Sequence, residues 1–322
     1  MNVPRLPEGE IEYAGARFCA GLQSVAPALV PHGRRLLARI ATPNWTLEWG
    51  LPRWLGDAFD LPPDVSAGLV LANAYGLAFV RLVDDLADGE NAGLEPAETV
   101  LLAGAMHSLW IGQVREVVGR AGQEPAGRGS AAWFWRDFDR YRTQWVQVLL
   151  DERLPSVPFC AYTEADFRRL AARAAPLKVC CAASCLLAGR EDDLPALEDA
   201  IDQLLVGAVL LDHALDWPED LAQGRANAFV AYASSLPQTA ENRDANRRRV
   251  LEAILLGRGA RPYFARIGDR LRAARDAAGV LPCAGLAGFL GWLDRETAAY
   301  ADRLRGEANA RLRAAAGAFM KL

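Results

Sequence analysis

Residues 66–89 read SAGLVLANAYGLAFVRLVDDLADG, and this stretch decides the fold class. Its first eighteen residues are apolar on nearly all sides, which predicts a helix buried in the middle of a bundle. Gly89 suits the position that follows a helix, so Asp84, Asp85 and Asp88 occupy the last turn. The helix dipole is negative there and favours Lys or Arg, so these acids contradict the local preference. At about 100° per residue, Asp84 and Asp88 share one face, with Asp85 beside it.

A second apolar run ends in acids in the same way. Residues 201–211, IDQLLVGAVLL, are followed by Asp212 and Asp216, which are four residues apart and share a helix face. Asp220 continues this spacing only if the helix passes Pro218. Proline lacks the amide hydrogen and its ring clashes with the carbonyl four residues earlier, so we predict that the helix ends at residue 217.

The remainder of the chain also predicts helices, because few segments alternate or are rich in β-branched residues. No linker or internal repeat divides the chain, so we expect one all-α domain over residues 1–322. The predicted helices cover residues 9–27, 31–42, 64–88, 94–120, 130–152, 163–188, 194–217, 243–257, 261–278 and 284–315.

Composition excludes several functional classes. The chain has 322 residues, of which 52% are hydrophobic, and a net charge of −4, which provides no basic field for nucleic acid. The longest stretch without a charge, residues 65–80, is shorter than the roughly 20 residues that a membrane-spanning helix needs. The N-terminus lacks the pattern of a signal peptide, and the six cysteines form no CxxC pair. We therefore expect a cytoplasmic protein without a membrane span or a nucleic-acid partner.

The two groups of acids suggest a metal site. A single acidic run at a helix end is usually a solvated cap, but here two matched runs each place carboxylates four residues apart. Carboxylates that lie close together repel one another and take up protons unless cations compensate them. Mg²⁺ fits because it prefers hard oxygen ligands and completes its coordination with water and phosphates. Two such groups facing each other would hold a diphosphate through Mg²⁺.

At these residues the chain resembles the class I isoprenoid (terpenoid) synthase superfamily. Asp84, Asp85 and Asp88 match its DDxxD motif, and residues 79–88, FVRLVDDLAD, resemble the first motif of squalene and phytoene synthases. The resemblance implies an all-α helical bundle around a central apolar cavity. It also implies a cluster of three Mg²⁺ ions that bind a prenyl diphosphate, the loss of diphosphate, and a carbocation.

The second motif combines features of several subfamilies. Residues 194–216 resemble the helix that leads into the second DDxxD of trans-prenyltransferases, with His213 in place of an aspartate. Asp212, Asp216 and Asp220 match the ligand spacing of the second terpene cyclase motif. Residues 216–225, DWPEDLAQGR, look like the corresponding string of phytoene synthases.

Two differences from these family motifs favour one reaction over the others. GENAG at residues 89–93 stands where chain-elongating synthases carry Arg-Arg-Gly, and Leu215 stands where squalene and phytoene synthases carry Arg. A chain without clear features for a second substrate fits a terpene cyclase acting on farnesyl or geranylgeranyl diphosphate. The alternatives are a prenyl-coupling synthase, a chain-elongating synthase, and a non-catalytic helical scaffold. Homodimers are common in the families that the chain resembles.

Basic and aromatic residues complete the predicted site, although a solvated helix face or plain core packing is the alternative for each. His107 and His213 are candidate bases for the final cation, with a buried, hydrogen-bonded histidine as the alternative. The candidates for binding diphosphate are Arg173, Lys178, Arg225, Tyr300 and Arg303. The candidates for lining the cavity, where ring faces would stabilise a cation, are Phe79, Trp133, Phe138 and Trp217.

Overall fold

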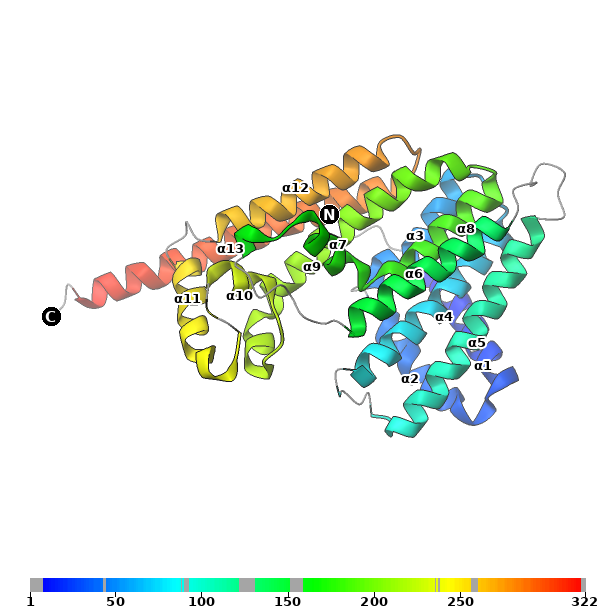
Figure 1. Ribbon diagram of the computed structural model, residues 1–322, viewed down its shortest axis with the longest axis horizontal. Coiled ribbons are helices and arrows are strands. Elements are labelled where there is room, and N and C mark those ends of the chain that lie inside the picture. The colour runs from blue at the N-terminus through cyan, green and yellow to red at the C-terminus, as the bar shows by residue number, and fades with distance from the viewer. Residues whose placement is uncertain are drawn as a thin grey trace. The chain divides into compact units, whose positions relative to one another are not determined.

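The computed structural model of the protein describes residues 8–42, 45–87, 89, 93–121, 131–150, 159–234, 236, 238–255 and 260–319. All regular structure in these ranges is helical, which confirms the predicted all-α class. The thirteen α-helices of the described residues (Figure 1) are α1 (Glu8–Val25), α2 (Val30–Ile40), α3 (Thr46–Ala58), α4 (Pro63–Ala87), α5 (Pro96–Ala121), α6 (Ala132–Leu150), α7 (Glu164–Ala172), α8 (Lys178–Ala188), α9 (Leu194–Gln223), α10 (Ala228–Ala233), α11 (Arg243–Leu255), α12 (Arg261–Ala278) and α13 (Ala284–Phe319).

The chain forms two compact units, each of which is described by itself. Unit 1 consists of residues 1–149, 174–198 and 278–289, and unit 2 consists of residues 150–173, 199–277 and 290–322. The first group of acids belongs to unit 1, and the second group belongs to unit 2. The expectation of a single domain over residues 1–322 stays a prediction.

Helix α4 is the central helix of unit 1. It packs against α1, α2, α3, α5 and α8, so the predicted position in the middle of a bundle is confirmed. Gly76 permits the close packing of α4 on α5, because a Cβ atom there would lie 2.9 Å from the indole ring of Trp110. Ala78 and Leu82, further along α4, are completely buried.

Helix α3 is an element that the sequence analysis did not predict. Pro52 lies inside it and cannot donate to the carbonyl of Glu48, four residues earlier. The buried side chain of Asn73 in α4 donates its amide hydrogen to that carbonyl. The helix therefore continues through Pro52 because a neighbouring helix supplies the missing donor.

Helix α9 in unit 2 also continues through a proline. It includes Pro218 and ends at Gln223, so the prediction of an end at residue 217 was wrong. The carbonyl of Ala214, which Pro218 leaves without its helical donor, accepts a hydrogen bond from the hydroxyl of Tyr300 at 3.3 Å. Asp220 therefore lies on the same helix as Asp212 and Asp216.

The predicted helix over residues 163–188 was wrong, because the chain is interrupted at Pro176. Helix α7 ends at Ala172, a short 3-10 turn (Ala175–Leu177) contains the proline, and α8 begins at Lys178. A proline fixes its own backbone and keeps the preceding residue out of the α-helical region. The interruption places Arg173 at the end of one helix and Lys178 at the start of another.

Aromatic side chains form the core of unit 2. The ring of Tyr263 in α12 lies 4.9 Å from that of Phe229 in α10 and 5.1 Å from that of Phe159, centre to centre. The hydroxyl of Tyr263 donates to the carbonyl of Leu210 in α9 at 2.8 Å. These contacts fix the middle of α9, directly before its acidic residues.

Among the described residues, one helix has the length and composition to cross a membrane. This helix is α4, and 67% of its most apolar window is buried inside the protein, as in a core helix. The bent pair of α7 and α8 would be a second candidate only if both helices were counted as one span.

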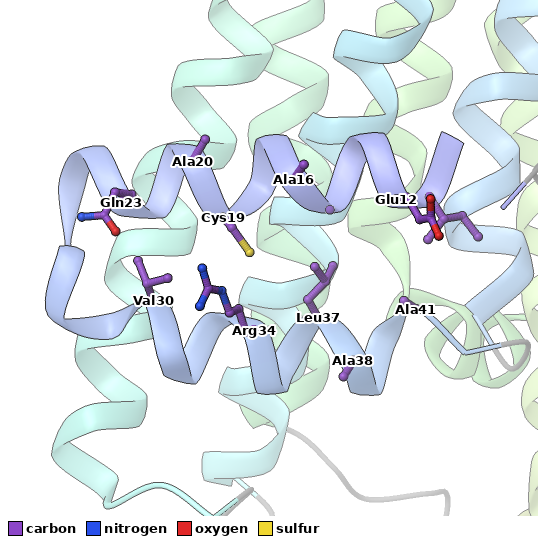
Figure 2. A pocket seen from close by; sticks show the side chains of 12 residues that line it. Glu12, Ala16, Cys19, Ala20, Gln23, Val30, Arg34, Leu37, Ala38 and Ala41 are labelled. Atoms are coloured by element: carbon purple, nitrogen blue, oxygen red, sulfur yellow. The ribbon is translucent and has the colours of Figure 1, made fainter. Parts of the chain in front are cut away.

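A groove of about 740 Å³ lies between α1 and α2. Figure 2 shows Cys19 of α1 and Arg34 of α2 pointing toward each other across it. Its walls include the small residues Gly15, Ala16 and Ala38. None of the predicted site residues lines this groove, so the predicted central cavity stays a prediction.

Candidate active site

The first group of acids lies at the end of α4 in unit 1, as predicted. Asp84 is half-buried, whereas only 1% of Asp85 is exposed. Asp88 lies outside the described residues. The two adjacent carboxylates of this motif therefore have different surroundings.

Two arginines hold the buried carboxylate of Asp85. Its Oδ2 lies 3.0 Å from Nη1 of Arg39 in α2, and its Oδ1 lies 2.8 Å from Nη2 of Arg81 in α4. Arg81 thus forms the local ion pair that its spacing of four residues suggests. These ion pairs fix the end of α4 to α2, and the metal-binding roles of Asp84, Asp85 and Asp88 stay predictions.

An aromatic cluster lies between α4, α5 and α6. Phe79 lies 4.8 Å from the ring of His107 and 5.4 Å from that of Trp145, and Phe138 lies 5.0 Å from that of Trp110, centre to centre. Phe79 and Phe138 thus have core contacts, and their predicted role in lining a cavity stays a prediction. Trp133, also predicted to line the cavity, is half-buried in α6.

The face of α4 that carries Asp84 includes two apolar residues that the sequence analysis did not name. At about 100° per residue, Phe79 lies roughly 140° around the helix from Asp84, whereas Leu77 and Val80 lie within about 40° of it. Both are half-buried. Counting helical positions back from Asp84 would have identified these residues.

Lys178 lies in a buried polar network of unit 1. It is 4% exposed, and its Nζ lies 5.3 Å from the ring centre of Tyr141. The hydroxyl of Tyr141 donates to the carboxylate of Glu198, which also pairs with Arg140 at 2.6 Å. Burial, followed by the bond to Glu198, raises the pKa of Tyr141, so its hydroxyl stays protonated. The network places the side chain of Lys178 in the same unit as Asp84.

The second group of acids shares one helix in unit 2. Asp212 and Asp216 are exposed, and Asp220 is half-buried. Burial raises the pKa of Asp216, and the charges of Asp220 and Glu219 raise it further. Burial also raises the pKa of Asp220, while the hydrogen bond from Asn227 and the charges of Arg225 and Arg173 oppose this effect. Carboxylates that repel one another in this way favour a bound cation.

His213 lies between these acids and is only 7% exposed. Its Nδ1 accepts a hydrogen bond from the backbone N–H of Ala228 at 3.1 Å. Burial lowers the pKa of His213 to about 4, with a smaller contribution from the charge of Arg173. His213 is therefore neutral at pH 7, and it is buried and hydrogen-bonded as the alternative interpretation predicts, while its role as a base stays a prediction.

The structure brings some of the predicted diphosphate-binding residues toward the second group of acids. Arg173 at the end of α7 and Arg225 after α9 both act electrostatically on Asp220. The hydroxyl of Tyr300 donates to α9, and the guanidinium of Arg303 lies 5.6 Å from the ring centre of Tyr300. Trp217, predicted to line the cavity, is half-buried beside Asp216. The diphosphate and cavity roles of these residues stay predictions.

Carboxylates such as those of Asp84 and of Asp212, Asp216 and Asp220 are the kind of oxygen donor that Mg²⁺ prefers. Among the described residues, no three His, Cys, Asp or Glu side chains gather in a position to hold a metal ion. Mg²⁺ is commonly held by one or two carboxylates together with substrate phosphates, so a complete protein cage is unnecessary. Burial, with a smaller contribution from neighbouring acids, raises the pKa of Asp216 and Asp220, and a bound cation would favour their ionised forms.

Comparisons with known proteins identify the fold. No family model and no curated protein matches the sequence. A solved polyprenyl synthase from Caulobacter crescentus CB15, complexed with calcium and isoprenyl diphosphate, is similar with a TM-score of 0.64 and 18% identity, covering 90% of this chain and 94% of that chain. A geranylgeranyl pyrophosphate synthetase from the archaeon Geoglobus acetivorans is similar with a TM-score of 0.65 and 14% identity, covering 89% of this chain and 97% of that chain. The chain therefore has the all-helical fold of the class I isoprenoid synthases.

Proposed function

We propose that this protein is a Mg²⁺-dependent prenyl diphosphate synthase, which joins an allylic prenyl diphosphate to isopentenyl diphosphate. The observation that carries the proposal is the position of acids on two helices, Asp84 on α4 and the series from Asp212 to Asp220 on α9. The fold shared with two prenyl synthases over most of the chain supports elongation above the cyclase favoured by the sequence patterns.

In the proposed reaction, the acidic residues bind Mg²⁺ and the positively charged residues bind the diphosphate. Asp84, Asp212, Asp216 and Asp220 would hold Mg²⁺, with Asp88 as a further predicted ligand. When bound, Mg²⁺ neutralises charge on the departing diphosphate and acts as a Lewis acid. Lys178, Arg173 and Arg225 would add positive charge around the diphosphate oxygens. The double bond of isopentenyl diphosphate would then attack the allylic cation and form the new carbon–carbon bond, and loss of a proton from the resulting cation would form a new double bond.

A terpene cyclase is the second candidate function. Residues 89–93, GENAG, lack the Arg-Arg-Gly string of chain-elongating synthases, which favours a reaction with one substrate. The same acids would release diphosphate in either case, so the two functions differ only in what captures the cation.

Product analysis separates these functions. The purified protein is incubated with Mg²⁺ and geranyl, farnesyl or geranylgeranyl diphosphate, each with and without isopentenyl diphosphate. Elongation predicts a longer prenyl diphosphate that forms only when isopentenyl diphosphate is present. A hydrocarbon or alcohol from one substrate alone would establish the cyclase instead. A product of two allylic molecules would indicate prenyl coupling, and no turnover of any substrate would contradict all of these functions.

A further inference from the structure

Asn227 links the two ends of the second group of acids. It lies in the turn after α9 and is completely buried. Its Nδ2 donates to the carbonyl of His213 at 2.9 Å and to Oδ2 of Asp220 at 2.7 Å. One amide group therefore connects the turn that contains Asp212 to the carboxylate two turns later, across Pro218.

The orientation of this amide is fixed by its other contacts. Its Oδ1 accepts hydrogen bonds from the backbone N–H groups of Phe229 and Val230 at 2.9 and 3.0 Å, which caps the start of α10. Only an oxygen can accept both bonds, so the nitrogen must face Asp220. Gln238 further holds the backbone of Asn227 through two hydrogen bonds of 2.9 and 3.0 Å.

We infer that Asn227 is a positioning residue that holds one carboxylate oxygen of Asp220 and leaves the other to bind a cation. The inference rests on the proposed function, because it takes Asp220 to be a ligand of the diphosphate-bound Mg²⁺. Groups that orient metal ligands commonly change metal affinity about 10- to 100-fold when they are replaced. Asn227 would act in this way without touching the cation or the substrate.

The substitution Asn227→Asp separates positioning from folding. Aspartate keeps the size of the side chain and its ability to cap α10, since a carboxylate also accepts from backbone N–H groups. It removes the donor to Asp220 and places a second negative charge beside that carboxylate. Asn242→Asp is a matched control, because Asn242 lies in the same unit and its side chain has an exposed hydrogen bond to Thr239.

The test measures the rise in melting temperature on titration with Mg²⁺ in the presence of inorganic diphosphate. The wild-type protein and the Asn242→Asp control should respond alike, whereas Asn227→Asp should need at least about tenfold more Mg²⁺. A normal Mg²⁺ response of Asn227→Asp would overturn the inference while leaving the proposed function intact. If the wild-type protein itself does not respond, the proposed function fails and the inference fails with it.

A double variant controls for folding. Asp220→Asn combined with Asn227→Asp exchanges donor and acceptor, so it should recover stability that Asn227→Asp loses in the absence of ligand. It should not recover the Mg²⁺ response, because position 220 then lacks a carboxylate. Recovery of that response would show that Asn227 has only a structural role, and would overturn the inference.

Discussion

Asp84 and Asp85 are neighbours in the chain, but their carboxylates have different surroundings. Asp85 is buried between Arg39 and Arg81, whereas Asp84 is half-buried at the end of α4. Replacing Asp85 would remove two ion pairs at once, while the arginines, which are 40% and 30% exposed, would keep access to water. The two residues should therefore respond differently to the same substitution, Asp85 in stability and Asp84 in activity.

Asp85→Asn should destabilise the protein. Both arginines lose their charged partner but stay in contact with water, so we expect the free energy of unfolding to fall by about 1 to 3 kcal/mol. Urea unfolding measures this change. Asp57→Asn is the matched control, because Asp57 also pairs with an arginine four residues away but is 61% exposed, and its loss should cost less than about 0.5 kcal/mol. Equal losses in the two variants would contradict the anchoring role of Asp85.

Glu48 should make stability depend on pH. Burial raises the pKa of Glu48 from 4.5 to about 7, and among the described residues its buried Oε2 has no hydrogen-bond partner. The folded protein binds this proton more tightly than the unfolded chain. The stabilisation is therefore complete below pH 4.5 and is lost as the pH rises toward about 7.

Unfolding in urea at pH 5 and pH 8 tests this expectation. From pH 5 to pH 8, the free energy of unfolding of the wild-type protein should fall by about 2 to 3 kcal/mol more than that of Glu48→Gln, because glutamine cannot ionise. The same loss in both proteins would show that another group causes the pH dependence.

Individual contacts differ in how far the sequence could predict them. The pair of Arg81 and Asp85 follows from a spacing of four residues on one helix. The pair of Arg39 and Asp85 joins residues 46 apart, so it depends on the packing of α2 against α4. The capping of α10 by Asn227 has a local signature, but its bond to Asp220 depends on how the chain turns after α9.

Among the secondary-structure elements, the long apolar helices could be predicted from the sequence, whereas the helix boundaries near prolines could not. Pro52 and Pro218 both lie inside helices that local rules would end. In each case a distant side chain, Asn73 or Tyr300, donates to the carbonyl that the proline leaves unpaired. Local patterns carry no information about such donors, so these helices could be established only from the fold.

A double-mutant cycle on α9 tests this explanation. Tyr300→Phe removes the hydrogen-bond donor to the carbonyl of Ala214 and should lower the free energy of unfolding of the otherwise wild-type protein by about 1 kcal/mol. Pro218→Ala restores a backbone N–H that can pair with the same carbonyl, so Tyr300→Phe should cost much less in that background. Urea unfolding of the wild type, the two single variants and the double variant gives the coupling energy between positions 218 and 300. An equal cost in both backgrounds would show that the hydroxyl of Tyr300 does not compensate for Pro218.

At the scale of the whole molecule, each unit contains one group of acids that the sequence identified. The motifs predicted the acids and the superfamily fold, because composition, order and spacing agreed along the chain. They favoured a cyclase, whereas two solved structures that are similar to this chain are prenyl synthases. The proposed metal ligands form motifs in the sequence, whereas no motif marks the residues that would direct the cation, so the reaction is harder to predict than the fold.

We propose that the acids of α4 and α9 both act in the release of diphosphate from a prenyl substrate. The most direct measurement is the rate of diphosphate release from farnesyl diphosphate with Mg²⁺ and isopentenyl diphosphate. Asp84→Asn and Asp216→Asn should each slow release by at least about 100-fold. Asp199→Asn, an exposed acid at the other end of α9, should leave the rate unchanged. Release at the wild-type rate by the combined Asp84→Asn and Asp216→Asn variant would contradict the claim.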